Sequence, residues 1–303
     1  MIYFARCYIN YLSVADMAKK WNMSKRTVRN YCAQGRIADA KLIGKIWSIP
    51  ENAQKPERLN KKSSAPSLLS ILREQKRAKT SGGIYHKIQI DLTYNSNHIE
   101  GSRLTHDQTR YIFETNTIGF ENEAVNVDDI IETSNHFRCI DMVIEQAGAT
   151  LCEKFIKQLH STLKTGTSDS RKDWFAVGEY KKIPNEVGGC DTALPEEVAD
   201  KMRKLLADYN AKSNITFDDI VEFHVAFERI HPFQDGNGRV GRLILLKECL
   251  KHNIVPFIIE DNLKLFYYRG LKEWHNEKGY LIDTCLTAQD RFKAYLDYFR
   301  IEY

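Results

Sequence analysis

The stretch HPFQDGNGRVGR, His231 to Arg242, joins two segments that have the apolar spacing of helices. Before it, TFDDIVEFHVAFERI repeats apolar residues at helical intervals and begins with a capping threonine, Thr216. After it comes the apolar segment RVGRLILLKECL. Glycines allow the backbone to turn tightly between the two. We therefore predict one helix that ends near Ile230 and a second that starts near Asn237 or Gly238.

The predicted turn carries groups suited to binding polyphosphate. Unpaired N–H groups at the start of a helix attract anions, and Gly236 and Gly238 let phosphate oxygens approach without a Cβ in the way. Arg239 and Arg242 are three residues apart, so they share a helix face and can both hold a polyphosphate. The stretch lacks the G-x-x-x-x-G-K-[ST] spacing of a P-loop.

Two further side chains supply chemistry to this loop. Asp235 can hold Mg²⁺, which prefers carboxylate and phosphate oxygens. His231 can act as the base for a hydroxyl nucleophile. The structural alternative is a buried histidine with two surface arginines beside a glycine turn. That alternative explains any single residue but not the whole set.

The same twelve residues match every specified position of HPFx[D/E]GNGRxxR, the signature of Fic proteins, which the chain resembles from Ile84 to Tyr303. The resemblance implies transfer of AMP from ATP to a Ser, Thr or Tyr hydroxyl of a protein, with ATP and Mg²⁺ required. It implies that His231 takes the hydroxyl proton, that Phe233 anchors the loop and that Asp235 ligates the metal.

The resemblance also assigns the phosphate contacts. Asn237 and the amides around Gly236 and Gly238 are expected to hold the α-phosphate, and Arg239 and Arg242 the β- and γ-phosphates. The related Doc kinases have lysine in place of Gly238, and a phosphocholine-transferring relative has alanine in place of Gly236. This chain has neither change, which favours AMP transfer.

SNHIEG, Ser96 to Gly101, is similar to the inhibitory motif [S/T]-x-x-x-E-[G/N] of Fic proteins. We expect Glu100 to pair bidentately with Arg242 and thereby withhold it from the γ-phosphate. The structural alternative is that Ser96 caps a helix and Glu100 is a surface acid. In some Fic relatives this glutamate orients a water that removes AMP, so de-AMPylation through Glu100 is an open alternative.

Two weaker assignments also come from the resemblance. VGEYKKIPNEVGG is predicted to form the irregular hairpin, or flap, that binds the target segment, with Ile183 and Glu186 as flap residues. Its match is partial, because Val177-Gly178 and Lys181 replace the usual residues. Tyr267 and Tyr268 are expected to line the adenine pocket, although an aromatic pair on a helix is also typical of a core.

The N-terminal segment predicts a separate function. YLSVADMAKKWNMSKRTVRNYCAQGRI reads as two short helices joined by a turn, with the hairpin AKLIGKIWSIP after them. It resembles the winged helix-turn-helix of excisionase and MerR-type proteins, whose second helix enters the DNA major groove. A helical pair used for protein contacts is the alternative. The expected core is Val14, Met17, Ala18, Trp21, Val28 and Tyr31; the expected DNA contacts are Lys25, Arg26, Thr27 and Arg29.

Charge divides the chain in the same way. Residues 1–79 contain 17 Lys and Arg against 5 Asp and Glu, whereas the rest contains 27 against 35. A basic segment attached to an acidic one suggests two roles, the first with a polyanion. We expect a DNA-binding domain over 1–58, a linker with a short helix over 59–83 and a Fic domain over 84–303. The predicted fold class is mainly α, a Fic-type helical bundle with a small β-hairpin flap after a small winged helix-turn-helix domain.

Composition excludes several classes of protein. No apolar run reaches membrane-spanning length, no signal peptide is evident, and the seven cysteines show no C-x-x-C spacing. We expect a cytoplasmic protein with reduced thiols and no membrane partner, and homo-oligomerisation is possible. The main hypothesis is an autoinhibited protein adenylyltransferase. The alternatives are a de-AMPylase or a transcription regulator whose Fic core senses nucleotide.

Overall fold

The computed structural model describes residues 10–56, 66–119, 124–187 and 190–303. Residues 1–9 and 57–58 of the expected N-terminal domain, the linker up to residue 65, and Gly188 and Gly189 of the flap lie outside these ranges. The described residues are mainly helical, which confirms the predicted fold class. None of their helices is both long enough and apolar enough to cross a membrane.

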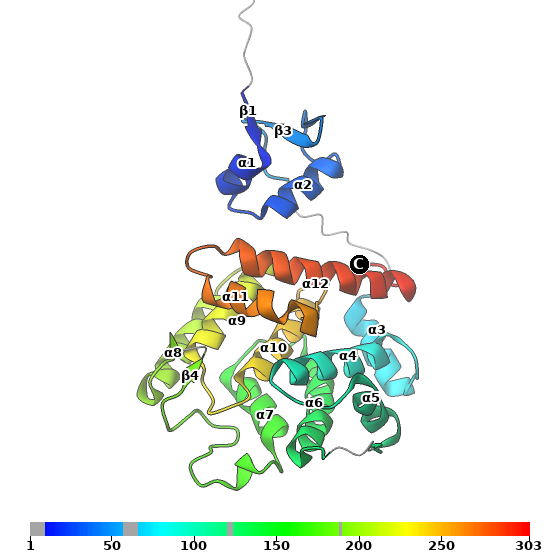
Figure 1. Ribbon diagram of the computed structural model, residues 1–303, viewed down its shortest axis with the longest axis vertical. Coiled ribbons are helices and arrows are strands. Elements are labelled where there is room, and N and C mark those ends of the chain that lie inside the picture. The colour runs from blue at the N-terminus through cyan, green and yellow to red at the C-terminus, as the bar shows by residue number, and fades with distance from the viewer. Residues whose placement is uncertain (1–9, 57–65, 120–123, 188–189) are drawn as a thin grey trace, which may run out of the picture.

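The N-terminal unit consists of a helical pair and a small sheet (Figure 1). Ser13 and Ser24 cap the two helices by accepting backbone N–H bonds. The antiparallel sheet has the order β1-β3-β2. All six predicted core residues are buried in a hydrophobic cluster of this unit. Its elements are β1 (Tyr11–Ser13), α1 (Val14–Trp21), α2 (Lys25–Ala33), β2 (Lys41–Ile43) and β3 (Ile46–Pro50).

The larger unit is a bundle of helices with one small hairpin (Figure 1). Its helices are α3 (Leu68–Ala78), α4 (Ile84–Ile99), α5 (His106–Thr115), α6 (Val127–Gln146), α7 (Glu153–Lys164), α8 (Pro195–Asn210), α9 (Phe217–Ile230), α10 (Asn237–Lys251), α11 (Lys264–Lys272) and α12 (Gly279–Tyr298). Two 3₁₀ turns, Asp169–Arg171 and Asp261–Leu263, and the antiparallel hairpin of β4 (Glu186–Val187) and β5 (Cys190–Asp191) complete it.

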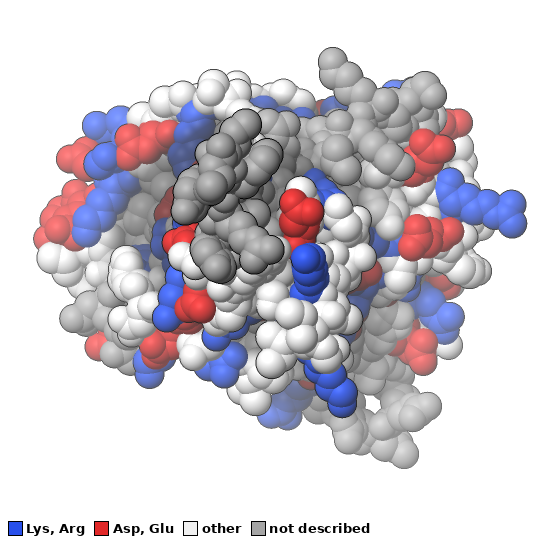
Figure 2. Space-filling model, turned by 90° about the horizontal axis from the view of Figure 1, so that it is seen from above, with Lys and Arg blue, Asp and Glu red and all other residues white. Residues whose placement is uncertain are grey.

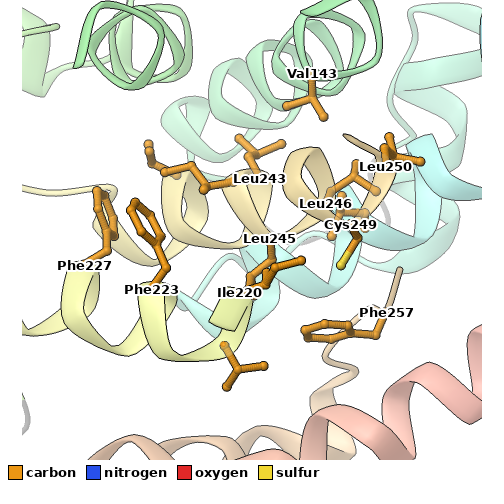
Figure 3. Packing of buried hydrophobic residues seen from close by; sticks show 14 of the residues in the cluster. Val143, Ile220, Phe223, Phe227, Leu243, Leu245, Leu246, Cys249, Leu250 and Phe257 are labelled. Carbon is orange, nitrogen blue, oxygen red and sulfur yellow. The ribbon is translucent and has the colours of Figure 1, made fainter. Parts of the chain in front are cut away.

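Helix α10 lies at the centre of this unit and packs against α4, α6, α7 and α9. Figure 3 shows Phe223 and Phe227 of α9 facing the leucines of α10. Every residue of α10 from Arg239 to Leu250 is buried. A helix that is buried all round has no polar face, and the four charged residues of this stretch, Arg239, Arg242, Lys247 and Glu248, are paired inside the bundle. The motif at its start is therefore held on a rigid support.

Helix α3 belongs to the same core. Leu68 is 8% exposed and Leu72 is fully buried, and both are members of the large hydrophobic cluster. Arg73 donates to the backbone carbonyls of Ile144 and Glu145 at the end of α6. The short helix that was expected to belong to a linker therefore packs as part of the helical bundle.

Candidate active site

The loop between α9 and α10 has a fixed backbone shape. His231 ends α9 in the left-handed region, at φ 51°, and Gly236 precedes α10 at φ 79°. Phe233 is fully buried, and its ring stacks on His160 with centroids 4.0 Å apart. His160 also donates from Nε2 to the carbonyl of Asp235 at 3.1 Å and accepts at Nδ1 from the Gly178 N–H at 2.9 Å. This histidine thus joins the loop to the segment that leads into the flap.

The side-chain amide of Asn237 is bonded within the loop. Its Oδ1 accepts from the Phe233 N–H and its Nδ2 donates to the Phe233 carbonyl, both at 2.8 Å. The residue is 1% exposed. Because both polar atoms of the amide are used inside the loop, the side chain shapes the turn that precedes α10.

His231 is oriented as a base. Its Nδ1 lies 3.1 Å from the carbonyl oxygen of Glu228. A carbonyl only accepts, so Nδ1 carries the hydrogen and Nε2 keeps its lone pair. Burial lowers the pKa of His231 below its ordinary 6.5, assisted by Lys181 and opposed by the Glu228 carbonyl and Glu100. The ring is therefore neutral at pH 7 and able to accept a proton.

Asp235 belongs to a network of ion pairs. Its Oδ2 lies 2.7 Å from Lys164 Nζ and 3.2 Å from Arg239 Nη2. Glu132 of α6 accepts from the same two cations, from Lys164 at 2.5 Å and from Arg239 Nη1. Although burial acts to raise the pKa of Asp235, Arg239 and Lys164 hold it well below its ordinary value. Asp235 is therefore anionic over the physiological range.

Arg242 is held by the segment predicted to be inhibitory. Its Nη2 lies 2.5 Å from Glu100 Oε1, and its Nε and Nη2 donate to the Ser96 hydroxyl and carbonyl at 2.9 Å. The structure gives one contact between the two side chains, Glu100 Oε1 to Arg242 Nη2, and Ser96 accepts from Nε and Nη2 of the same guanidinium. Although burial disfavours its charge, Glu100 raises the pKa of Arg242. The arginine remains charged, and its donors point at α4.

Glu100 also occupies the space beside Gly238. A Cβ added to Gly238 would lie 2.3 Å from Glu100 Oε1. The carboxylate therefore lies against the first turn of α10, where the helix dipole favours negative charge. A carboxylate in this place would repel a phosphate group brought to the same helix end.

The predicted flap connects to the loop through its main chain. The amide of Gln234 exchanges two hydrogen bonds of 3.3 Å with the N–H and carbonyl of Ile183, which is 44% exposed. Glu186 lies in β4 and pairs with Asp191 of β5. Lys181 is 3% exposed and binds Asn185 and Thr192 at 2.6 Å from Nζ.

The two predicted adenine-pocket tyrosines lie in different environments. Tyr267 is 1% exposed, and its hydroxyl lies 2.6 Å from Nε2 of His224. Tyr268 is 39% exposed, and its hydroxyl donates to the carbonyl of Ile99 at 3.3 Å. Tyr267 thus has core surroundings, the alternative stated above, whereas Tyr268 has an exposed surface available for a ligand.

The predicted DNA contacts lie on the N-terminal half of α2. Lys25 and Arg29 are exposed, and Thr27 packs against the Ser24 cap. Arg26 binds Asp290 at 2.6 Å and Thr287 at 3.0 Å, both on α12. Figure 2, which views the molecule from above, shows Lys and Arg mixed with Asp and Glu among the described residues of that view, without a single basic patch.

Residues 150–249 match the Fic/DOC family. The match contains the whole loop from His231 to Arg242. A Fic-domain signalling protein of Bacteroides thetaiotaomicron superposes with a TM-score of 0.57 at 26% identity, covering 76% of this chain and 90% of that one. A Fic family protein of Desulfovibrio desulfuricans, 19% identical, shares the fold with a TM-score of 0.58 over 78% of this chain and 74% of its own.

Curated relatives carry the name protein adenylyltransferase Fic. The protein of Culex quinquefasciatus is 30% identical over 227 residues, which cover 71% of this chain and 42% of that protein. The Drosophila melanogaster protein is 28% identical over 228 residues, covering 71% of this chain and 43% of its own length. The chain thus spans less than half the length of these relatives.

The loop offers Mg²⁺ a single carboxylate ligand, which fits a metal that arrives bound to a nucleotide. Mg²⁺ in nucleotide sites takes one or two carboxylates and completes its shell with phosphates and water. Asp235 supplies one carboxylate, and its side chain is 48% exposed. Among the described residues, no three His, Cys, Asp or Glu side chains are placed to hold a metal together.

The motifs of the sequence do not include Glu132, Lys164 or His160. Glu132 and Lys164 lie on α6 and α7, outside any motif. In the sequence, each is one charged residue in a segment with helical spacing, and acids and lysines are common in such segments. The structure shows instead that both lie against Asp235 or Arg239.

Proposed function

We propose that this chain is an autoinhibited protein adenylyltransferase that transfers AMP from ATP to a Ser, Thr or Tyr hydroxyl of a protein. The contact of Glu100 and Ser96 with Arg242, at the mouth of a loop that carries a correctly oriented His231, supports this function best. The names of the curated relatives agree with the reaction class.

The proposed chemistry follows from the loop. Nε2 of His231 takes the proton of the target hydroxyl while its oxygen attacks the α-phosphorus. The bond from that phosphorus to the α,β-bridging oxygen breaks, and pyrophosphate leaves. The N–H groups at the start of α10 receive the phosphate charge, and Arg239 and Arg242 hold the outer phosphates. Mg²⁺ held by Asp235 would neutralise charge on the phosphates.

The proposed brake acts on the contact of Arg242 with the γ-phosphate. While Glu100 and Ser96 hold Nη2 and Nε of Arg242, these donors are not available to the γ-phosphate, and the carboxylate repels it. ATP is then held in a pose unsuited to in-line attack. Release of Glu100 shifts the population towards the competent pose.

The test is transfer of label from α-labelled ATP with Mg²⁺ to the protein itself or to added proteins. We expect Glu100→Gly to gain one adenylyl unit by intact mass and to label strongly, and wild type to label weakly. Glu100→Gly combined with His231→Ala should show no label. Glu74→Gln, at an exposed glutamate of α3, is the control and should behave as wild type. An unlabelled Glu100→Gly variant that is folded and binds ATP would count against the proposal.

The reverse reaction uses the same groups. The Glu100 side chain is 28% exposed, so its carboxylate can reach water as well as Arg242. A de-AMPylase would release AMP from a modified protein as wild type and lose this activity as Glu100→Ala. Adenylylation requires the opposite response to loss of Glu100.

A second candidate function is DNA binding by residues 1–58. The exposed Lys25 and Arg29 on the N-terminal half of α2, the helix after the turn, favour it. Phosphate contacts made by such residues weaken as salt rises. The full chain should retard fragments of its own operon, with a steep salt dependence that Lys25→Ala and Arg29→Ala reduce. Unchanged mobility at low salt would reject this second function.

A further inference from the structure

We propose that Lys164 is a built-in counter-ion that keeps a divalent cation out of the resting site, so that the metal enters only together with the nucleotide. This inference rests on the proposed use of Asp235 as the metal ligand. It concerns the protein without nucleotide, which the proposed transfer reaction does not describe.

Lys164 is placed as an internal cation. It is the last residue of α7, and its side chain is 2% exposed. Its Nζ lies 2.5 Å from Glu132 Oε1, 2.7 Å from Asp235 Oδ2 and 3.2 Å from Asp169 Oδ2. A buried ammonium with three carboxylates around it stands in the position that a bound metal ion takes in an acidic cluster.

The ion pairs close into a ring. Glu132 and Asp235 each accept from both Lys164 and Arg239, so two anions alternate with two cations. The third carboxylate, Asp169, is also paired with Lys172 at 2.7 Å. The charges around Asp235 are therefore balanced before any ligand arrives.

This balance disfavours a free dication. A doubly charged ion at Asp235 would lie at short range from the fixed charges of Lys164 and Arg239, whose own side chains are 2% and 5% exposed. A nucleotide changes this balance, because its triphosphate brings several negative charges and the oxygen ligands that Mg²⁺ prefers. Since the Asp235 side chain is 48% exposed, it remains accessible to a metal that arrives on phosphate.

The test measures Mn²⁺ binding by electron paramagnetic resonance in the complete absence of nucleotide. Wild type should bind Mn²⁺ only weakly at Asp235. Lys164→Met removes the internal charge, and we expect it to bind Mn²⁺ at least about ten-fold more tightly. Lys164→Arg keeps the charge and should match wild type. Adding Asp235→Asn to Lys164→Met should abolish the gained site.

Two results would overturn the proposal. One is a folded Lys164→Met that binds Mn²⁺ no better than wild type. The other is wild-type binding of Mn²⁺ with a Kd below about 1 mM that Asp235→Asn removes. This second measurement needs no Lys164 variant, so it remains decisive if Lys164→Met does not fold. Neither result depends on AMP transfer, so failure of this inference and failure of the proposed reaction are distinguishable. Circular dichroism and thermal melting check folding, which the remaining Arg239 contacts to both carboxylates should preserve.

Discussion

Glu100 Oε1 lies 2.5 Å from Arg242 Nη2, although 142 residues separate the two along the chain. Ser96, one helical turn before Glu100, binds the remaining side of the same guanidinium. The contact joins the end of α4 to the first turns of α10. The proposed regulation depends on whether Glu100 and Ser96 or a phosphate binds Arg242.

Substitutions at Ser96 and Glu100 should therefore raise self-labelling to different extents. Ser96→Ala removes one hydrogen bond to Arg242 but leaves the Ser96 carbonyl in place. One hydrogen bond to a charged group contributes about 1.5 kcal/mol, so self-labelling should rise by about ten-fold or less. Glu100→Gly should exceed it in the same assay. Equal labelling by both variants would contradict the graded clamp.

Gly238→Ala should disturb the same contact from the other side. The new Cβ would lie 2.3 Å from Glu100 Oε1, so the carboxylate has to move away from Arg242. We expect a loss of about 1–3 kcal/mol in the free energy of unfolding in urea, as for a buried group left without its partner. The loss should be much smaller in a Glu100→Gly background. Two additive losses would show that Glu100 does not occupy this space.

The pH dependence of transfer should report on His231. Burial places its pKa below 6.5, so the base is unprotonated at pH 7 and is lost only as pH falls through the lowered pKa. We expect kcat/KM of Glu100→Gly to be level from pH 7 upward to pH 8 and to fall below pH 6.5. Glu100 raises this pKa, so its removal moves the acidic limb to lower pH. An acidic limb above pH 6.5 would contradict the neutral, buried base.

Glu132→Ala should destabilise the fold. It leaves the buried Lys164 and Arg239 without their shared partner, which we expect to cost about 3 kcal/mol in urea unfolding. Adding Lys164→Met should recover part of this loss, because one uncompensated charge is removed with it. Glu222→Ala, at a surface acid paired with Lys212 and Lys278, is the control and should change stability by less than about 1 kcal/mol.

Asp290→Asn should strengthen DNA binding if α2 makes the DNA contact. The change frees Arg26 from its 2.6 Å ion pair with α12. By fluorescence anisotropy, we expect this variant to bind duplex DNA a few-fold more tightly. Arg26→Ala should bind DNA more weakly, and the slope of log K against log salt concentration should fall in magnitude by about one. Asp297→Asn, on the same helix, should have no effect. Reduced binding by Asp290→Asn would assign α2 to another partner.

The sequence predicted the features that lie within one short stretch. The helix ends around His231–Arg242 and the helical class could be read from apolar spacing and glycines, because these act locally. The contact of Glu100 with Arg242 could be anticipated only through a motif. The share that the Ser96 hydroxyl and carbonyl take in the same guanidinium could not be inferred from the sequence. The direction of the Asn237 amide was equally unreadable, because one sequence allows it to face either the loop or a ligand.

The ring around Asp235 could not be predicted for a different reason. Lys164 is 32 residues from Glu132 and 71 from Asp235. Each is an ordinary charged residue near a helix end or on a helix face, where exposure is the usual outcome. Only the packing of α6 and α7 against α10 brings them together, and that packing is a property of the whole bundle.

The order of Ser96, Glu100 and Arg242 along the chain has a consequence for biosynthesis. A ribosome completes α4 well over a hundred residues before it produces Arg242. Both partners of the arginine therefore exist before the arginine does, and the helices that carry them fold into a single core. Under the proposed regulation, the contact with Arg242 therefore forms as the bundle folds, and an activating event acts on the folded protein.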